Sequence, residues 1–170
     1  MIYLGVDPGL RITGYGVLRF NGGFIDVLDA GVIRSSPDAP LPARLDELFS
    51  GMLEVIDRYR PLVMGMEKLY SHYGHPLTAV KMAHARGVLC LAAARRNVNQ
   101  VQLSATRVKK LVTGNGRASK EQVSGMVRHL LGIESEIRPF DVTDALAVAI
   151  AAYESDRNDR KYKRIGGRYL

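Results

Sequence analysis

Four acidic residues at the ends of apolar segments are the part of this sequence best suited to chemistry. Asp7 ends one apolar segment and Glu67 ends another, while Asp141 and Asp144 open a third. Asp141 and Asp144 are three residues apart and therefore share one face of a helix. Carboxylates are the ligands that Mg²⁺ and Mn²⁺ prefer, and two such ions can drive phosphodiester hydrolysis. We expect the four acids to meet around divalent metal.

The segments that end in Asp7 and Glu67 have the composition of β-strands, and each carries a glycine two residues before its acid. Side chains of a strand alternate between its two faces, so Gly5 shares a face with Asp7, and Gly65 shares a face with Glu67. We expect each glycine to leave open space beside the carboxylate. An acid at the end of an apolar strand needs a partner, which favours a shared site for something cationic.

Three of these acids also have explanations that involve no chemistry. Asp7 begins the sequence Asp-Pro-Gly, which is common in turns. Asp141 and Asp144 can stabilise the start of a helix, one as its N-cap and the other in its first turn. The residues alone leave these alternatives open.

The order of the apolar patterns predicts an α/β fold. An antiparallel meander of three strands comes first and strands then alternate with helices, which gives a mixed sheet of five strands with helices on both faces. Strands are expected at residues 2–7, 13–20, 24–33, 62–67 and 98–103, and helices at residues 43–60, 77–96, 104–112, 119–131 and 141–152. The first and fourth strands are expected to be parallel neighbours, which brings Asp7 and Glu67 together.

The helix at residues 77–96 is rich in small side chains, which permit close packing between helices, so it belongs either in the core or at a subunit interface. Ser119 and Gln122 predict a capping box at the start of a later helix, and Gly132 predicts its end. Residues 1–156 form the predicted domain. The basic, polar segment 157–170 is expected to be a mobile tail.

Charge is distributed unevenly along the chain, whose net charge is +7. Residues 81–128 contain 10 basic and 1 acidic residues, whereas residues 129–156 contain 1 basic and 6 acidic residues. Such a division suits a protein that binds a polyanion and coordinates cations at one point. Lys109, Lys120 and Arg117 lie in the basic segment and are candidates for phosphate contacts, with solvated surface positions as the alternative. The turn at residues 114–117 either approaches phosphate through its backbone N–H groups or simply connects two helices.

Several classes of protein are excluded by composition. The single cysteine, Cys90, rules out an internal disulfide. We find no targeting segment and no stretch near the roughly 20 apolar residues of a membrane span, so a cytoplasmic protein without a membrane partner is expected. His72 and His75 are not expected to bind zinc, because no further Cys or His completes a site.

These residues stand in an order that resembles the RuvC family of Holliday junction resolvases. The similarity runs from residue 2 to about residue 153. The segments that carry it are Leu4–Gly9, Thr13–Gly16, Glu67 with Tyr70, Ala85–Gly87, Val108–Lys109, Gly114–Val123 and Asp141–Ala147.

The resemblance implies a ribonuclease H-like fold and a homodimeric, Mg²⁺-dependent endonuclease. Such an enzyme cuts two strands of four-way junction DNA symmetrically during recombination and repair, in partnership with the RuvA–RuvB branch-migration complex. It implies that the metal-binding catalytic acids are Asp7, Glu67, Asp141 and Asp144. It also implies that Lys109 and Lys120 contact DNA at the active site and that Tyr70 acts on bases near the crossover.

Three other functions compete with this interpretation. An actin-like or kinase-type ATPase also uses an Asp-x-Gly opening, but generally needs two related domains around the nucleotide. A non-catalytic nucleic-acid-binding module is disfavoured because all four acids are present. A nuclease for flaps, RNA hybrids or other branched DNA is not separated from a junction resolvase by the sequence.

Overall fold

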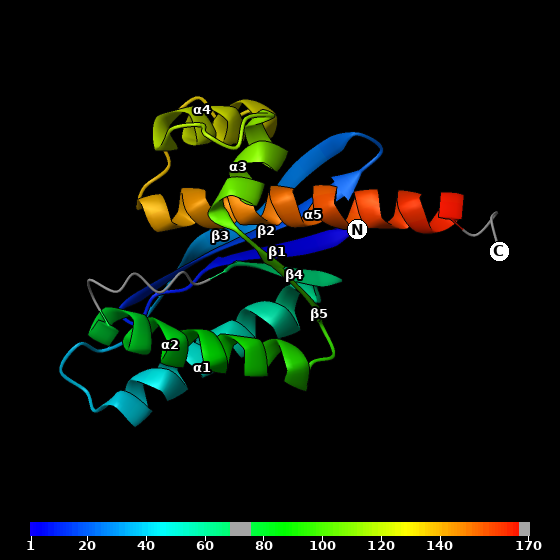
Figure 1. Cartoon of the computed structure of the whole chain (residues 1–170). Coiled ribbons are helices and arrows are strands. Elements are labelled where there is room, and N and C mark those ends of the chain that lie inside the picture. Colours follow the sequence, from blue (N-terminus) through cyan, green and yellow to red (C-terminus); the bar gives the residue numbers. More distant parts are fainter. Residues whose placement is uncertain (69–75, 167–170) are drawn as a thin grey trace.

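The computed structural model describes residues 1–68 and 76–166, with side chains for residues 1–68 and 77–160. Its centre is one sheet of five strands in the order β3-β2-β1-β4-β5. The strands are β1 (Ile2–Asp7), β2 (Ile12–Asn21), β3 (Phe24–Arg34), β4 (Val63–Glu67) and β5 (Asn99–Leu103). The helices are α1 (Leu41–Tyr59), α2 (Pro76–Arg95), α3 (Ala105–Thr113), α4 (Lys120–Leu131) and α5 (Phe140–Gly166). Helices α1 and α2 cover one face of the sheet, and α3, α4 and α5 lie on the other (Figure 1).

Strand β1 is the middle strand of the sheet and determines where the first two acids lie. It pairs antiparallel with β2, with Asp7 opposite Gly14, and parallel with β4, with Val6 opposite Met66. Because β1 and β4 are parallel, their carboxyl ends meet at the same edge of the sheet, and Asp7 and Glu67 end neighbouring strands. The predicted α/β class, mixed pairing and helices on both faces are confirmed.

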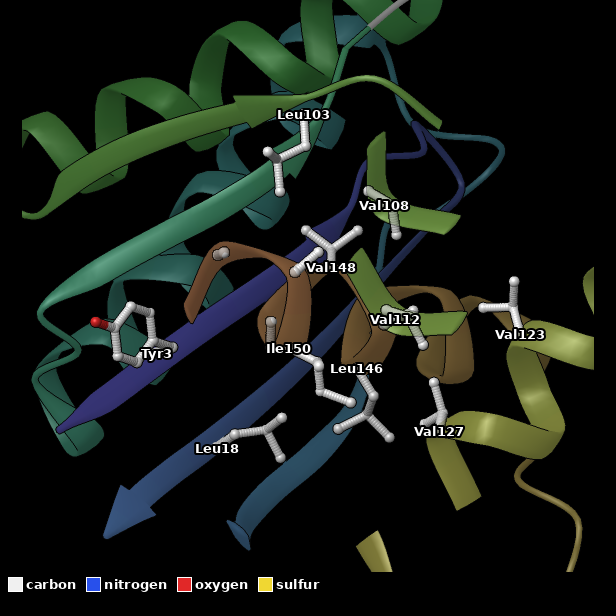
Figure 2. Close-up of a cluster of buried hydrophobic side chains, with 14 of the residues drawn as sticks. Tyr3, Leu18, Leu103, Val108, Val112, Val123, Val127, Leu146, Val148 and Ile150 are labelled. Atoms are coloured by element: carbon white, nitrogen blue, oxygen red, sulfur yellow. The ribbon is translucent and has the colours of Figure 1, made fainter. Parts of the chain in front are cut away.

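Alternation along β1 divides the core into two parts. Tyr3 packs with residues of α3, α4 and α5 in the cluster drawn in Figure 2. Leu4 and Val6 face the opposite side and pack with residues of α1 and α2. The strand is therefore buried on both faces, which fixes the direction of Asp7 at its end.

The glycines before Asp7 and Glu67 have a different role from the one predicted. A Cβ on Gly5 would lie 2.0 Å from the backbone oxygen of Ala145, and a Cβ on Gly65 would lie 2.7 Å from Cβ of Ala152. The space beside each glycine is filled by α5, so the prediction of open space beside the carboxylates was wrong. Glycine lets α5 pack directly on β1 and β4, and this close packing positions the start of α5 beside the strand ends.

Replacing Gly5 with Ala is expected to lower the free energy of unfolding by about 3 kcal/mol, because the added methyl group overlaps backbone that cannot move independently. Gly125→Ala in α4 is the matched control. A Cβ there meets nothing within 4 Å, so alanine should stabilise the helix by about 0.5–1 kcal/mol. Urea denaturation measures both changes, and equal stabilities of the two variants would contradict the packing described here.

The ends of the shorter helices agree with the sequence prediction. Ser104 caps α3 and accepts a hydrogen bond from the backbone N–H of Arg107. Ser119 and Gln122 form the predicted capping box of α4, and Gly132 ends that helix in a left-handed conformation. These caps fix where α3 and α4 begin.

Helix α5 is longer than predicted. It crosses the expected domain boundary at residue 156 and continues to Gly166, where the sequence predicted a tail without helical pattern. The Tyr3 hydroxyl donates a hydrogen bond of 2.5 Å to Asp156, which in turn pairs with Arg160 at 2.8 Å. These contacts attach the polar part of the helix to β1, which an apolar periodicity does not reveal. The mobility of residues 157–170 stays a prediction.

Helix α2 has one buried and one exposed face. Ala85, Leu89, Ala92 and Ala93 are buried, whereas Leu77, Val80 and Leu91 are among the exposed residues. By length and composition alone, Leu77–Arg95 meets the threshold for a membrane span, with a mean hydropathy of 1.2 and 28% of the segment buried. The prediction that no stretch approaches such a span was therefore wrong for α2.

Candidate active site

Acids from three elements line one cavity of about 350 Å³ at the carboxyl edge of β1 and β4. Asp7 comes from the end of β1, Glu67 from the end of β4 and Asp144 from the first turns of α5. The remaining lining residues come from α3, α4 and α5 and are Ala105, Val108, Lys109, Lys120, Val123 and Ala147. The predicted convergence of two strand ends and one helix start is confirmed for these three acids.

Asp141 lies beside this cavity rather than in its lining. A Cβ on Gly14 would lie 2.1 Å from the backbone oxygen of Asp141, so the start of α5 packs against β2 at this point. Gly14 is the residue that pairs with Asp7. Asp141 is therefore close enough to Asp7 for its charge to act on that residue.

Burial and like charges raise the pKa of two carboxyl groups. Burial is the largest cause for Asp7, followed by the charges of Asp144, Asp141 and Glu67, and together they raise its pKa to about 7. The pKa of Glu67 is also raised, mainly by burial and then by the charge of Asp144. Shifted pKa values of several acids in one cavity are typical of a functional site.

Two lysines place positive charge against these carboxylates. Nζ of Lys120 lies 3.5 Å from Oδ2 of Asp144, and Lys109 lines the same cavity from α3. The Lys120 charge lowers the pKa of Asp7 and of Glu67, and the Lys109 charge lowers that of Glu67, which opposes the larger effects of burial and repulsion. The structure therefore brings both predicted lysines to the acids.

Arg117 is not among the described residues that line this cavity. Tyr70 lies outside the described residues, as do His72 and His75. Arg117 is exposed, and its backbone N–H donates to Oδ1 of Asn115 at 2.9 Å. The N–H groups of Asn115 and Ala118 also have partners within this connection. The turn at residues 114–117 thus uses these donors internally, which favours the simple connection over a phosphate-binding loop.

The family model described as "Crossover junction endodeoxyribonuclease RuvC" matches residues 3–152. The chain belongs to the RuvC family. A RuvC from Rhodopirellula baltica is 45% identical over 150 residues, covering 88% of this chain and 84% of that protein. A RuvC from Legionella pneumophila is 40% identical over 167 residues, covering 98% of this chain and 94% of that protein.

A solved structure of T. thermophilus RuvC in complex with Holliday junction substrate superimposes with a TM-score of 0.88 at 31% identity. The superposition covers 94% of this chain and 96% of that chain. The fold is thus the ribonuclease H-like fold of the RuvC family, as the sequence predicted. As a RuvC family member, the chain is a metal-dependent nuclease that acts in Holliday junction resolution.

The acids of this RuvC family member fit hard divalent ions by their chemistry. The site offers carboxylate oxygens from three elements, and their mutual repulsion is what a cation offsets. Within residues 1–68 and 77–160, however, no three His, Cys, Asp or Glu side chains are gathered closely enough to hold an ion as they stand. Lys120 neutralises part of the charge at Asp144.

Sequence reasoning assigned no role to Arg86, although it is part of the segment that carries the resemblance to the RuvC family. The Arg86 side chain is buried and donates a hydrogen bond from Nη1 to the backbone oxygen of Glu67. It also lowers the pKa of Glu67 through its charge, after the two lysines. One sequence signal could have pointed to Arg86. It is an arginine in a helix whose other residues are mostly small, and such a composition is typical of a closely packed helix.

Proposed function

We propose that this chain is a homodimeric, Mg²⁺-dependent endonuclease that resolves four-way DNA junctions by symmetric cuts, with Mn²⁺ as an alternative ion. One observation supports this above all others: Asp7, Glu67 and Asp144 line a single cavity together with Lys109 and Lys120. Carboxylates bind divalent cations and ammonium groups bind phosphate, so the cavity has ligands for the metal ions and for the DNA phosphate.

In this proposal the four acids Asp7, Glu67, Asp141 and Asp144 hold two ions. When bound, the ions supply activation of the attacking water and stabilisation of the leaving oxygen. Lys109 and Lys120 bind the phosphodiester and orient it over the acids. Asp7 must lose its proton before it ligates a cation, so metal binding near neutral pH releases protons. Arg86 holds the end of β4 through the Glu67 carbonyl and so orients the Glu67 side chain.

The exposed face of α2 supports the homodimer. Leu77 is 76% exposed, Val80 52% and Leu91 47%, which is unusual for large apolar residues on one helix. A second copy that covers this face through a two-fold axis would present two identical active sites to a junction of matching symmetry. We place the enzyme in the cytoplasm with its DNA, as a partner of the RuvA–RuvB complex, with Tyr70 and Arg117 as further DNA contacts. The family resemblance supports the partner and Tyr70, whereas Arg117 is supported by its exposed position in the basic segment 81–128.

A substrate panel at equal salt tests the proposed function. We expect wild-type protein with Mg²⁺ to cut a synthetic four-way junction symmetrically, and to leave linear duplex, flap and RNA–DNA hybrid substrates of the same length uncut under the same conditions. Gel analysis of both labelled strands gives the cut positions. Preferential cutting of flaps or hybrids would show that the four-way junction is not the preferred substrate. Absence of cutting on every substrate would refute the proposed nuclease activity.

Replacing Lys120 with Ala is expected to weaken junction binding several-fold and to reduce the slope of log Kd against log salt by about one. The lysine lines the acidic cavity, and its loss removes one phosphate partner. Arg58→Ala is the control, since Arg58 is exposed near the end of α1, at the opposite edge of the sheet. Fluorescence anisotropy across a salt series measures the slope for each variant. Equal slopes for Lys120→Ala and Arg58→Ala would mean that Lys120 is a solvated surface lysine without a phosphate contact.

A further inference from the structure

A second, smaller cavity of about 230 Å³ lies between the starts of α4 and α5. It shares Lys120 and Asp144 with the active-site cavity, so the two spaces meet at this ion pair. Its other lining residues include Ser124 and Arg128 of α4, and Phe140 and Thr143 of α5. None of these four residues has a role in the mechanism above.

Phe140 provides an aromatic surface in this cavity. It is 49% exposed, although a large apolar side chain normally lies in the core. The Arg138 guanidinium lies 3.9 Å from the centre of the Phe140 ring, and Arg138 is held by Glu136 through a contact of 3.1 Å. The ring is therefore fixed from one side by a stacked cation, and a planar group can stack on such a preorganised ring.

The polar groups of the cavity suit a base better than a phosphate. Glu121, Glu136 and Asp144 in the lining are balanced by Lys120, Arg128 and the adjacent Arg138, so the cavity carries no excess of positive charge for a phosphate. Carboxylates accept hydrogen bonds from exocyclic amino groups of bases, and they repel phosphate. Nη1 of Arg128 donates to the backbone oxygen of Glu134 at 3.1 Å, which holds this side chain in the cavity lining.

The distance along α5 relates this cavity to the reaction. Phe140 and Asp144 are four residues apart on one helix face, which corresponds to a rise of about 6 Å along the helix. A base on Phe140 therefore belongs to a nucleotide next to, or close to, a phosphate held by Lys120 beside Asp144.

From these observations we propose that the α4–α5 cavity binds the base of a nucleotide flanking the scissile phosphate, unstacked from its neighbours and stacked on Phe140. The inference rests on the proposed function, because it takes a DNA strand at Asp144 as given. It adds a base-binding subsite and a residue that contributes to the choice of the cut position.

Single-turnover cutting of junctions that each lack one base tests this subsite. An abasic position is moved through the three nucleotides on either side of the cut. Wild-type protein should lose about ten-fold in rate at one of these positions, as expected for one base–aromatic stack. Phe140→Ala should lose about ten-fold on the intact junction and nothing further at that position, because the base and the ring act as one pair.

Phe24→Ala is the matched control, because Phe24 is 78% exposed at the β2–β3 turn, far along β2 from Asp7, and should behave as wild type on every substrate. Phe140→Trp should keep the wild-type profile, and Phe140→Leu should resemble Phe140→Ala. The subsite is overturned if Phe140→Ala cuts the intact junction as wild type does, if it retains the full loss at the abasic position, or if Phe140→Leu is fully active. Wild-type protein that leaves the intact junction uncut would instead refute the proposed function.

Discussion

Asp7→Asn is expected to abolish cutting of a four-way junction, with a loss on the order of 10³-fold or more, while junction binding survives. Asparagine keeps the shape of the side chain but loses the negative charge that a divalent ion requires. Asp7 stands at the centre of the acids, since the charges of Asp144, Asp141 and Glu67 all act on it. In the proposed function, binding relies on basic residues such as Lys109 and Lys120, which the substitution leaves in place.

The measurement is the single-turnover rate on a synthetic junction with Mg²⁺, beside the Kd of the same junction by anisotropy. Asp38→Asn removes the same charge from an exposed loop between β3 and α1 and should leave both quantities unchanged. Cutting by Asp7→Asn at the wild-type rate would remove Asp7 from the mechanism. Loss of binding together with cutting would indicate that Asp7 contributes to the fold of the DNA-binding surface instead.

The strand order and the meeting of Asp7 with Glu67 were predictable because both follow from local patterns. An apolar strand followed by an acid occurs twice, and the connection between the two strands includes the helix α1, which makes parallel neighbours the natural arrangement. The capping box of α4 was predictable for the same reason, since Ser119 and Gln122 are three residues apart.

The features that the sequence did not reveal depend on packing between distant segments. Gly5 was interpreted as open space, but it is the contact point for α5, which lies about 140 residues further along the chain. The polar end of α5 is attached by the Tyr3–Asp156 hydrogen bond, which no periodicity encodes. Arg86 reaches the Glu67 backbone from a helix whose composition suggested only packing. Such contacts become visible only once the sheet and its helices are assembled.

The contribution of Asp7 to the free energy of unfolding should fall as the pH rises from about 4 to about 7, when EDTA keeps the protein free of metal. Burial and neighbouring acids raise the pKa of Asp7 to about 7 in the folded protein, whereas an unfolded aspartate titrates near 3.9. Between these values the folded state binds a proton that the unfolded state has lost, so rising pH favours unfolding. A shift of about three units corresponds to about 2–4 kcal/mol. Below pH 4 this destabilisation is absent, and above pH 7 it is complete.

The difference between wild type and Asp7→Asn isolates the titration of Asp7 together with its coupling to Asp144, Asp141 and Glu67, because groups away from the site titrate alike in both proteins. Urea denaturation across the pH series should show the variant about 2–4 kcal/mol more stable than wild type at pH 8, and the two converging, apart from a pH-independent offset, near pH 4. Saturating Mg²⁺ at pH 8 should stabilise wild type far more than the variant, since cations bind the charged carboxylates of the folded state. Parallel pH profiles for the two proteins would mean that Asp7 is solvated and uncoupled from Asp144, Asp141 and Glu67, and a metal site built on their proximity would then have to be abandoned.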